Sequence, residues 1–201
     1  MAKSKTMDKD RVLIDVMDAI YNRHAVRDYL PKKVESSVIN KLLDAAIHAP
    51  AALHEESRAF VVIQDKKILD RLSDTAKSLT LIESQQSSSQ QRNHILEVVN
   101  QKEFNVFYNA STLIVIYSTF HGPFVAADCW LAAENLMLSA LAHGLASCVI
   151  GFAITALNSP EWRAEFNIPK EMTAVAPIIV GLPAGNTVPA IHEPPKVLIW
   201  K

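Results

Sequence analysis

The residues with the clearest chemical potential form a short basic cluster, Arg23-His24-Ala25-Val26-Arg27. Two guanidinium groups and an imidazole can converge on a phosphate, because the fork of guanidinium donors matches the phosphate oxygens. The same side chains are also typical of a solvated basic turn. The residues alone favour that second interpretation, so a phosphate site is the alternative hypothesis at this point.

The other groups that do chemistry in proteins carry no supporting pattern here. The seven histidines are scattered, without the H-x-H or H-E-x-x-H spacing of a metal site. Glu55 and Glu56 are adjacent and point in different directions, which indicates a solvated turn rather than an acid–base pair. No serine stands in a G-x-S-x-G elbow, and neither Cys129 nor Cys148 has a nearby histidine in sequence. The sequence therefore predicts no metal site and no side-chain nucleophile.

Composition narrows the class of protein. Of the 201 residues, 49% are hydrophobic, which is enough to bury a substantial core. The net charge of −1 gives no electrostatic footprint for nucleic acid or an anionic membrane. The first ten residues lack the apolar run of a secretory signal, so a cytoplasmic location is expected. The five glycines form neither a G-x-G-x-x-G nor a P-loop pattern, so the usual nucleotide cradles are missing.

The stretch 128–152 predicts the centre of the fold. Its apolar residues fall on nearly every side of a helix, which is typical of a helix buried on all sides. Gly144 offers the left-handed conformation that often ends a helix, and residues 146–152 are expected to continue as a buried strand. Glu134 and His143 argue against a membrane span, for which about 20 apolar residues would be needed.

Helices and strands alternate on either side of this stretch. Amphipathic periodicity predicts a helix from Asp10 to about Asn22 with Asp10 as its cap. A second helix is expected over residues 38–47, capped by Ser36 or Ser37. The remaining predicted elements are helices beginning after Asp65 and after Ser159, and strands at 59–63, 112–117 and 175–180. The pattern indicates a mixed α and β class around one sheet.

Some segments are expected to lie outside the compact unit. Residues 1–9 are predicted to be a flexible tail, and residues 10–201 a single domain. Residues 83–103 are polar, which favours a solvated excursion over the alternative of a mobile cover above a site. The segment from residue 184 is stiffened by prolines and ends in Val197-Leu198-Ile199-Trp200. It is expected to reach across the domain or onto a second subunit.

Four segments, in this order, resemble the nitroreductase family of flavoproteins. The turn within Ile20–Tyr29 is similar to the family's R-R/H-S-x-R-x-F/Y motif. The stretch Leu42–Pro50, with the strand that follows, is similar to L-L-x-A-A-x-x-A-P-S. The stretch Asp128–Cys148 is similar to D-x-x-x-A-x-x-N-L-x-L-x-A-x-x-x-G-L-G-S, and Asn167–Pro183 with the closing apolar strand completes the set. Together the segments cover residues 12 to 200.

The resemblance implies an α+β fold with a central mixed or antiparallel sheet flanked by helices. It implies an intertwined homodimer that exchanges its C-terminal arms, residues 184–201, and holds FMN at the subunit interface. The implied activity transfers electrons from NADH or NADPH to a nitroaromatic, quinone or similar small acceptor in a ping-pong cycle. Because the flavin performs this chemistry, the resemblance implies no catalytic side chain.

The same resemblance implies ten cofactor-binding residues in three groups. The FMN phosphate would be held by Arg23, His24 and Arg27, with Ala25 and His192 at two further positions of the phosphate site. The flavin would be contacted from the other subunit by Ala51, Ala52 and His54. The flavin ring would face backbone groups of Ile150 and Gly151.

Several of these positions differ from the family's pattern. Ala25 and Ala51 stand where the family usually has serine, His54 replaces an asparagine, and His192 stands about where an arginine normally reaches the phosphate. Each lost contact typically costs about 1–3 kcal/mol, and protonated histidines would offset part of this loss. The substitutions motivate an alternative of a different class, a flavin-storage or flavin-sensing protein without turnover. A flavin-destroying or dehalogenating enzyme is a third hypothesis.

Overall fold

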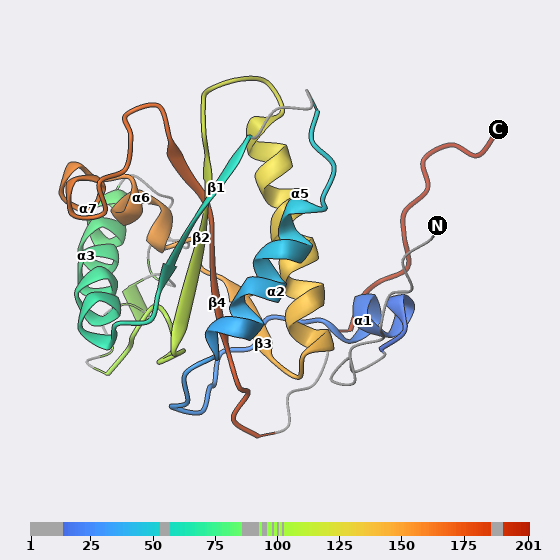
Figure 1. The fold of residues 1–201 in the computed structure, drawn as a ribbon, viewed down its shortest axis with the longest axis horizontal. Coiled ribbons are helices and arrows are strands. Elements are labelled where there is room, and N and C mark those ends of the chain that lie inside the picture. Colours follow the sequence, from blue (N-terminus) through green and yellow to red (C-terminus); the bar gives the residue numbers. More distant parts are fainter. Residues whose placement is uncertain are drawn as a thin grey trace, which may run out of the picture.

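A four-stranded antiparallel sheet lies at the centre of the fold, with helices on both faces (Figure 1). The computed structural model describes residues 14–52, 57–85, 93, 96–97, 99, 101, 103–185 and 191–201. The strands are β1 (Arg58–Ile63), β2 (Thr112–Ser118), β3 (Ala146–Val149) and β4 (Thr173–Gly181), in the order β1-β2-β4-β3. The described helices are α1 (Val16–Asn22), α2 (Ser36–Ile47), α3 (Lys66–Ser84), α5 (Val125–Ala142), α6 (Ala153–Leu157) and α7 (Pro160–Glu165). The α+β class expected from the sequence is confirmed.

The two faces of the sheet carry separate apolar layers. Successive residues of a strand point to opposite faces, and β2 is buried along its whole length. Its Leu113, Val115 and Tyr117 pack into the layer under α3, α6 and α7. Its Ile114 and Ile116 pack into the layer under α2 and α5. Figure 1 shows these two groups of helices on opposite sides of the strands.

Helix α5 is the central helix that the sequence predicts. It packs against α2 and against the sheet, and it contributes several fully buried residues. By length and composition alone it would be long enough to cross a membrane, but a buried core helix has the same composition. Gly144 follows it with a φ of +70°, so the predicted left-handed helix end is confirmed.

Side-chain capping explains where helices α3 and α7 begin. Asp65 accepts hydrogen bonds from the backbone N–H groups of Lys67 and Ile68 and so caps α3. Ser159 accepts from Trp162 N and caps α7 in the same way. Both starts agree with the sequence-based expectation. The strands predicted at 59–63, 112–117 and 175–180 are also present, within two residues at each end.

Three boundaries predicted from the sequence are wrong. Helix α1 begins at Val16 because the Asp15 side chain accepts from Met17 N at 2.8 Å, whereas Asp10 lies outside the described residues. Helix α2 already includes Ser36, so its N-cap is Glu35, which makes no side-chain capping bond. The strand expected over 146–152 ends at Val149, where the chain turns into α6. Of the predicted excursion at 83–103, residues 83 and 84 belong to α3, and Ser84 and Val99 are buried. The solvated excursion and the alternative of a cover stay predictions.

Candidate functional site

The basic cluster lies in the segment between α1 and α2, which is fastened alongside β3. Val26 N donates to Ser147 O at 3.2 Å, and Ala25 forms a short parallel bridge with Ser147. The Tyr29 hydroxyl donates to Val26 O at 2.7 Å. Val26 and Tyr29 are buried, whereas Ala25 and Arg27 are exposed. This arrangement directs the predicted binding residues outward from a fixed backbone.

A close approach holds the end of this segment in place. Tyr29 forms a bridge with Pro183 beyond β4, and a Cβ atom at Gly181 would lie 2.9 Å from Tyr29 Cδ1. Only glycine therefore leaves room for the Tyr29 ring at this point. Burial raises the pKa of the Tyr29 hydroxyl above its ordinary value, so it stays neutral and serves as a hydrogen-bond donor.

A cavity of about 210 Å³ brings Arg27 together with Ile150 and Gly151. We call it the Arg27 cavity. Tyr108 also lines it, with its ring centroid 5.9 Å from the Arg27 guanidinium carbon. A Cβ atom at Gly151 would meet nothing within 4 Å, so this backbone lies beside open space. Arg27 forms no ion pair with another described residue, and its charge is therefore available to an anionic ligand.

Arg23 and His24 line a neighbouring cavity of about 150 Å³. We call it the His24 cavity. Arg23 Nε lies 3.2 Å from Glu134 Oε1, so part of its charge is already compensated. His24 Nδ1 lies 2.8 Å from Asn22 O, and because a carbonyl only accepts, Nδ1 carries a hydrogen. Nε2 of the same ring is buried without a hydrogen-bond partner among the described residues. A protonated His24 would therefore donate from Nε2 to an anion.

Cys148 lines the Arg27 cavity but is not set up as a nucleophile. Burial raises the pKa of its thiol, and the opposing effect of the Arg27 and Arg23 charges is smaller. Burial likewise raises the pKa of Cys129 to about 11. Because the thiolate is the reactive species, both cysteines are inert near neutral pH.

The residues expected to contact a flavin from the other subunit lie far from the basic cluster within one chain. Ala52 N donates to Asp128 Oδ1 at 3.1 Å, in the first turn of α5. Ala25 instead pairs with Ser147, just beyond the other end of α5. Ala142 follows Asp128 by 14 positions in α5, which is about 21 Å of helix at about 1.5 Å per residue. Figure 1 shows the two segments at opposite ends of this helix.

The remaining predicted residues do not gather at the described cavities. His192 is exposed in the C-terminal segment and lines neither cavity. His54 lies outside the described residues, and Ala51 is half-buried beyond the end of α2. The sequence pattern does not predict Tyr108, whose φ is 50°, beside Asn109 at 57°. Asparagine often adopts this left-handed conformation but tyrosine rarely does, so only Asn109 carried a local signal.

The fold and these two cavities define an α+β domain with an exposed arginine and an unpartnered imidazole nitrogen beside β3. The model of the nitroreductase family matches residues 20–182, and the chain belongs to this family. The resemblance that the sequence motifs indicate is thereby confirmed.

Known relatives agree with this assignment. A putative NADH dehydrogenase/NAD(P)H nitroreductase of Methanothermobacter thermautotrophicus is 24% identical over 86% of this chain and 80% of its own. A nitroreductase structure with bound FMN from Bacteroides fragilis has a TM-score of 0.77 at 23% identity, covering 93% of this chain and 98% of its own. A BluB-like flavoprotein of Clostridium difficile has a TM-score of 0.75 at 22% identity, covering 90% and 95%.

Proposed function

We propose that this protein is an FMN-dependent oxidoreductase that takes electrons from NADH or NADPH and passes them to a small nitroaromatic, quinone or similar acceptor in a ping-pong cycle. The proposal rests on membership of the nitroreductase family together with one structural observation. That observation is the Arg27 cavity. There a guanidinium with no ion pair among the described residues, an aromatic wall and an open backbone at Gly151 surround one space.

The residues present fit the cofactor. Arg27 would bind the FMN phosphate. A protonated His24 would donate to it from the buried Nε2, which has no hydrogen-bond partner among the described residues. The backbone at Gly151 would face the ring, because a Cβ atom there would meet nothing within 4 Å. Ile150 would line the ring site beside it, although its N–H already donates to Pro177 O. Bound FMN would supply the two-electron chemistry, while the protein orients the ring and restricts access of water.

We further propose that two subunits share each flavin site and that the homodimer is the functional unit. Ala51, Ala52 and His54 of one chain would complete the site formed by Arg27 of the other, since one chain keeps Ala52 and the basic cluster at opposite ends of α5. The C-terminal arm supports this arrangement, because residues 191–201 are exposed along their whole length. A cytoplasmic location, without nucleic-acid or membrane partners, stays a prediction.

A flavin-storage or flavin-sensing protein is the second candidate. Ala25 presents only a methyl group where a hydroxyl would reach a phosphate, and Glu134 already engages Arg23. Both features weaken phosphate binding relative to a site with two free arginines and a hydroxyl. Flavin that binds but is never reduced by either nicotinamide would favour this candidate.

The visible absorption spectrum after soaking in FMN and desalting is the test. Retained flavin bands that bleach when NADH or NADPH is added without oxygen are the expected result. Retained bands that neither nicotinamide bleaches would favour the storage hypothesis. A colourless protein after soaking would contradict both, because neither function survives without bound flavin.

A further inference from the structure

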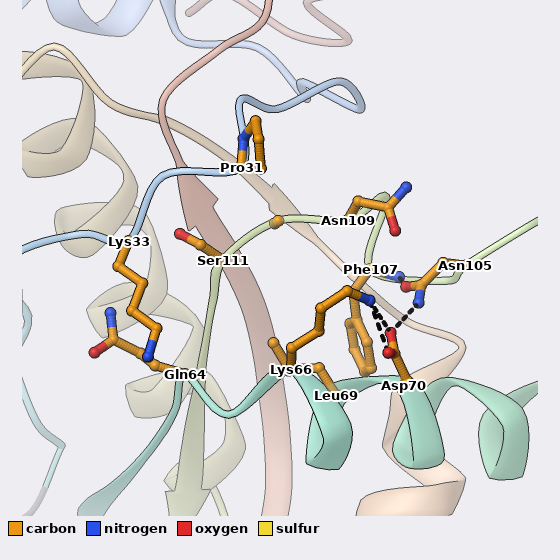
Figure 2. Close-up of a pocket in the computed structure, with 11 residues that line it drawn as sticks. Pro31, Lys33, Gln64, Lys66, Leu69, Asp70, Asn105, Phe107, Asn109 and Ser111 are labelled. Atoms are coloured by element: carbon orange, nitrogen blue, oxygen red, sulfur yellow. Dashed lines mark hydrogen bonds and ion pairs between the residues drawn. The ribbon is translucent and has the colours of Figure 1, made fainter.

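A third cavity, of about 370 Å³, lies between the start of α3 and the segment that leads into β2 (Figure 2). We call it the α3 cavity. It shares no lining residue with the Arg27 cavity or the His24 cavity. Its volume falls within the range of about 300–1,000 Å³ that is typical of small-molecule sites. No step of the proposed flavin chemistry uses it.

The interior of the α3 cavity is mainly apolar. Leu69, Phe107 and Ala110 line it and belong to the buried core, and Pro31 lines it from the segment before α2. Ligand sites of this kind bind an apolar body and use a few polar groups to orient its head. A flat aromatic ring system is therefore a suitable body for the occupant.

Of the charged side chains that line the cavity, one cation has no partner among the described residues. Lys66 Nζ lies 2.7 Å from Asp70 Oδ2, and Asn105 Nδ2 donates to Asp70 Oδ1 at 3.3 Å. The Asp70 carboxylate is thus fully engaged, as the dashed lines in Figure 2 show. Lys33 enters from another segment and forms no ion pair or side-chain hydrogen bond with another described residue. The cavity is lined by two lysines and one carboxylate, so a net positive charge remains that would attract the anionic group of a ligand.

A hydroxyl donor adds to this charge. Ser111 lines the cavity, and its buried Oγ has no hydrogen-bond partner among the described residues. In Figure 2 this hydroxyl points to the side from which Lys33 enters. Buried hydroxyl groups are normally hydrogen-bonded, so a missing partner indicates an acceptor that a ligand would bring. A carboxylate accepts from both an ammonium and a hydroxyl.

The segment 105–109 separates the α3 cavity from the Arg27 cavity. Phe107 and Asn109 line the α3 cavity, whereas Val106 and Tyr108 line the Arg27 cavity. Tyr108 and Asn109 both have left-handed backbone conformations, and their side chains line different cavities. A ligand in the α3 cavity therefore packs against the same short segment whose other side chains face the Arg27 cavity.

We propose that the α3 cavity is a binding site for a small aromatic carboxylate. The ring system lies against Leu69 and Phe107, and the carboxylate binds Lys33 and Ser111. The site is separate from the cavities assigned to the flavin, and the proposal does not depend on the proposed oxidoreductase activity.

Calorimetric titration of the FMN-soaked protein with 2-naphthoate and with neutral 2-naphthamide tests this proposal. The carboxylate is expected to bind about fivefold more tightly than the amide, since one partly exposed charge pair is worth up to about 1 kcal/mol. Lys33→Gln is expected to remove this difference, and Lys33→Arg to retain it. Lys32→Gln, at the neighbouring position that does not line the cavity, is the matched control and is expected to change nothing.

A second control separates the α3 cavity from the flavin cavities. Arg27→Gln is expected to leave the naphthoate affinity unchanged, because Arg27 does not line the α3 cavity. The proposal is overturned if naphthoate does not bind, or if Lys33→Gln behaves like Lys32→Gln. It is also overturned if Arg27→Gln, and not Lys33→Gln, weakens binding, because the anion would then occupy the Arg27 cavity.

Discussion

Trp162 and Trp200 represent two contrasting regions of the molecule. Trp162 is fully buried in the layer under α3, α6 and α7, beside Phe166 and beneath the guanidinium of Arg71. Trp200, in the C-terminal segment, is 90% exposed. The interior is therefore complete within one chain, whereas part of the apolar surface lacks any cover from the described residues of the same chain.

The uncovered surface is concentrated in a few elements. Residues on α1 and α5 and in the C-terminal segment expose large apolar side chains: Val16, Met17, Ile20, Tyr21, Trp130, Leu131, Ile191, Val197, Leu198, Ile199 and Trp200. Large exposed apolar patches mark interaction surfaces. This distribution supports the proposed dimer, in which the arm of one subunit would cover apolar surface of the other.

The largest expected effect is a loss of stability on tryptophan replacement, which should differ between the buried and the exposed region. Trp162→Ala is expected to lower the free energy of unfolding by about 3–5 kcal/mol, because it leaves a large cavity in a packed core. This loss is expected at every protein concentration in denaturant-unfolding experiments. Trp200→Ala is expected to lower stability only through the dimer, so its effect should vary with protein concentration.

Trp162→Phe provides a milder variant if the alanine variant does not fold. A concentration-independent loss for Trp200→Ala, equal to that of Trp162→Ala, would contradict the distinction between a complete interior and a shared surface.

Arg27→Gln is expected to weaken FMN binding about 10- to 100-fold, since a hydrogen bond to a charged group contributes about 1.5–3 kcal/mol. Fluorescence titration of free FMN measures this change. Arg71→Gln is the matched control, because Arg71 is paired with Glu165 and lines neither the Arg27 cavity nor the His24 cavity. Equal FMN affinities in the two variants would show that Arg27 does not hold the phosphate.

Alkaline pH is expected to lower the free energy of unfolding by ionising groups buried in the interior. Burial raises the pKa of Cys129 from 9.0 to about 11 and that of Tyr117 from 10.0 to about 12. The protonated forms are favoured in the folded state, so this stabilisation is complete below the unfolded pKa and is lost as pH rises through the folded pKa. We expect roughly 1–2 kcal/mol of stability to be lost between about pH 9 and pH 11.

Urea unfolding across this pH range measures the loss. Cys129→Ala is expected to be less stable at neutral pH but to lose less stability as the pH rises. An identical pH dependence in the variant would mean that the buried thiol does not contribute.

Ala25→Ser is expected to have the smallest effect and the opposite sign. Ala25 is exposed in the segment between α1 and α2 that pairs with β3, so a hydroxyl there would be free to donate to a phosphate. We expect FMN to bind about fivefold more tightly, corresponding to about 1 kcal/mol for one hydrogen bond. An unchanged affinity in a fluorescence titration would place the phosphate elsewhere.

Much of the fold is predictable because its causes are local. The caps at Asp65 and Ser159 and the buried run of β2 follow from residue types and periodicity. The start of α1 was not predictable in this way, because Asp10 and Asp15 are both suitable caps for the same apolar pattern. The end of β3 was not predictable either, since apolar residues continue beyond Val149 through Ile150 and Phe152 into α6.

The candidate site likewise has parts that could be predicted from the sequence and parts that depend on tertiary packing. The family resemblance implies that Arg27, Ile150 and Gly151 belong to one site, and the structure brings them together in one cavity. It does not predict Tyr108, because the left-handed backbone there depends on packing against Phe104 and Arg27. The distance between Ala52 and Ala25 depends on the length and position of α5, which no local pattern reports.

The most direct test of the shared site is sedimentation of the FMN-soaked protein over a dilution series, with protein and flavin absorbance followed together. We predict that flavin sediments only with the dimer and is released as the dimer dissociates, because one chain keeps Ala52 and Arg27 at opposite ends of α5. Flavin that sediments with a monomer would contradict the proposal that two subunits form each site.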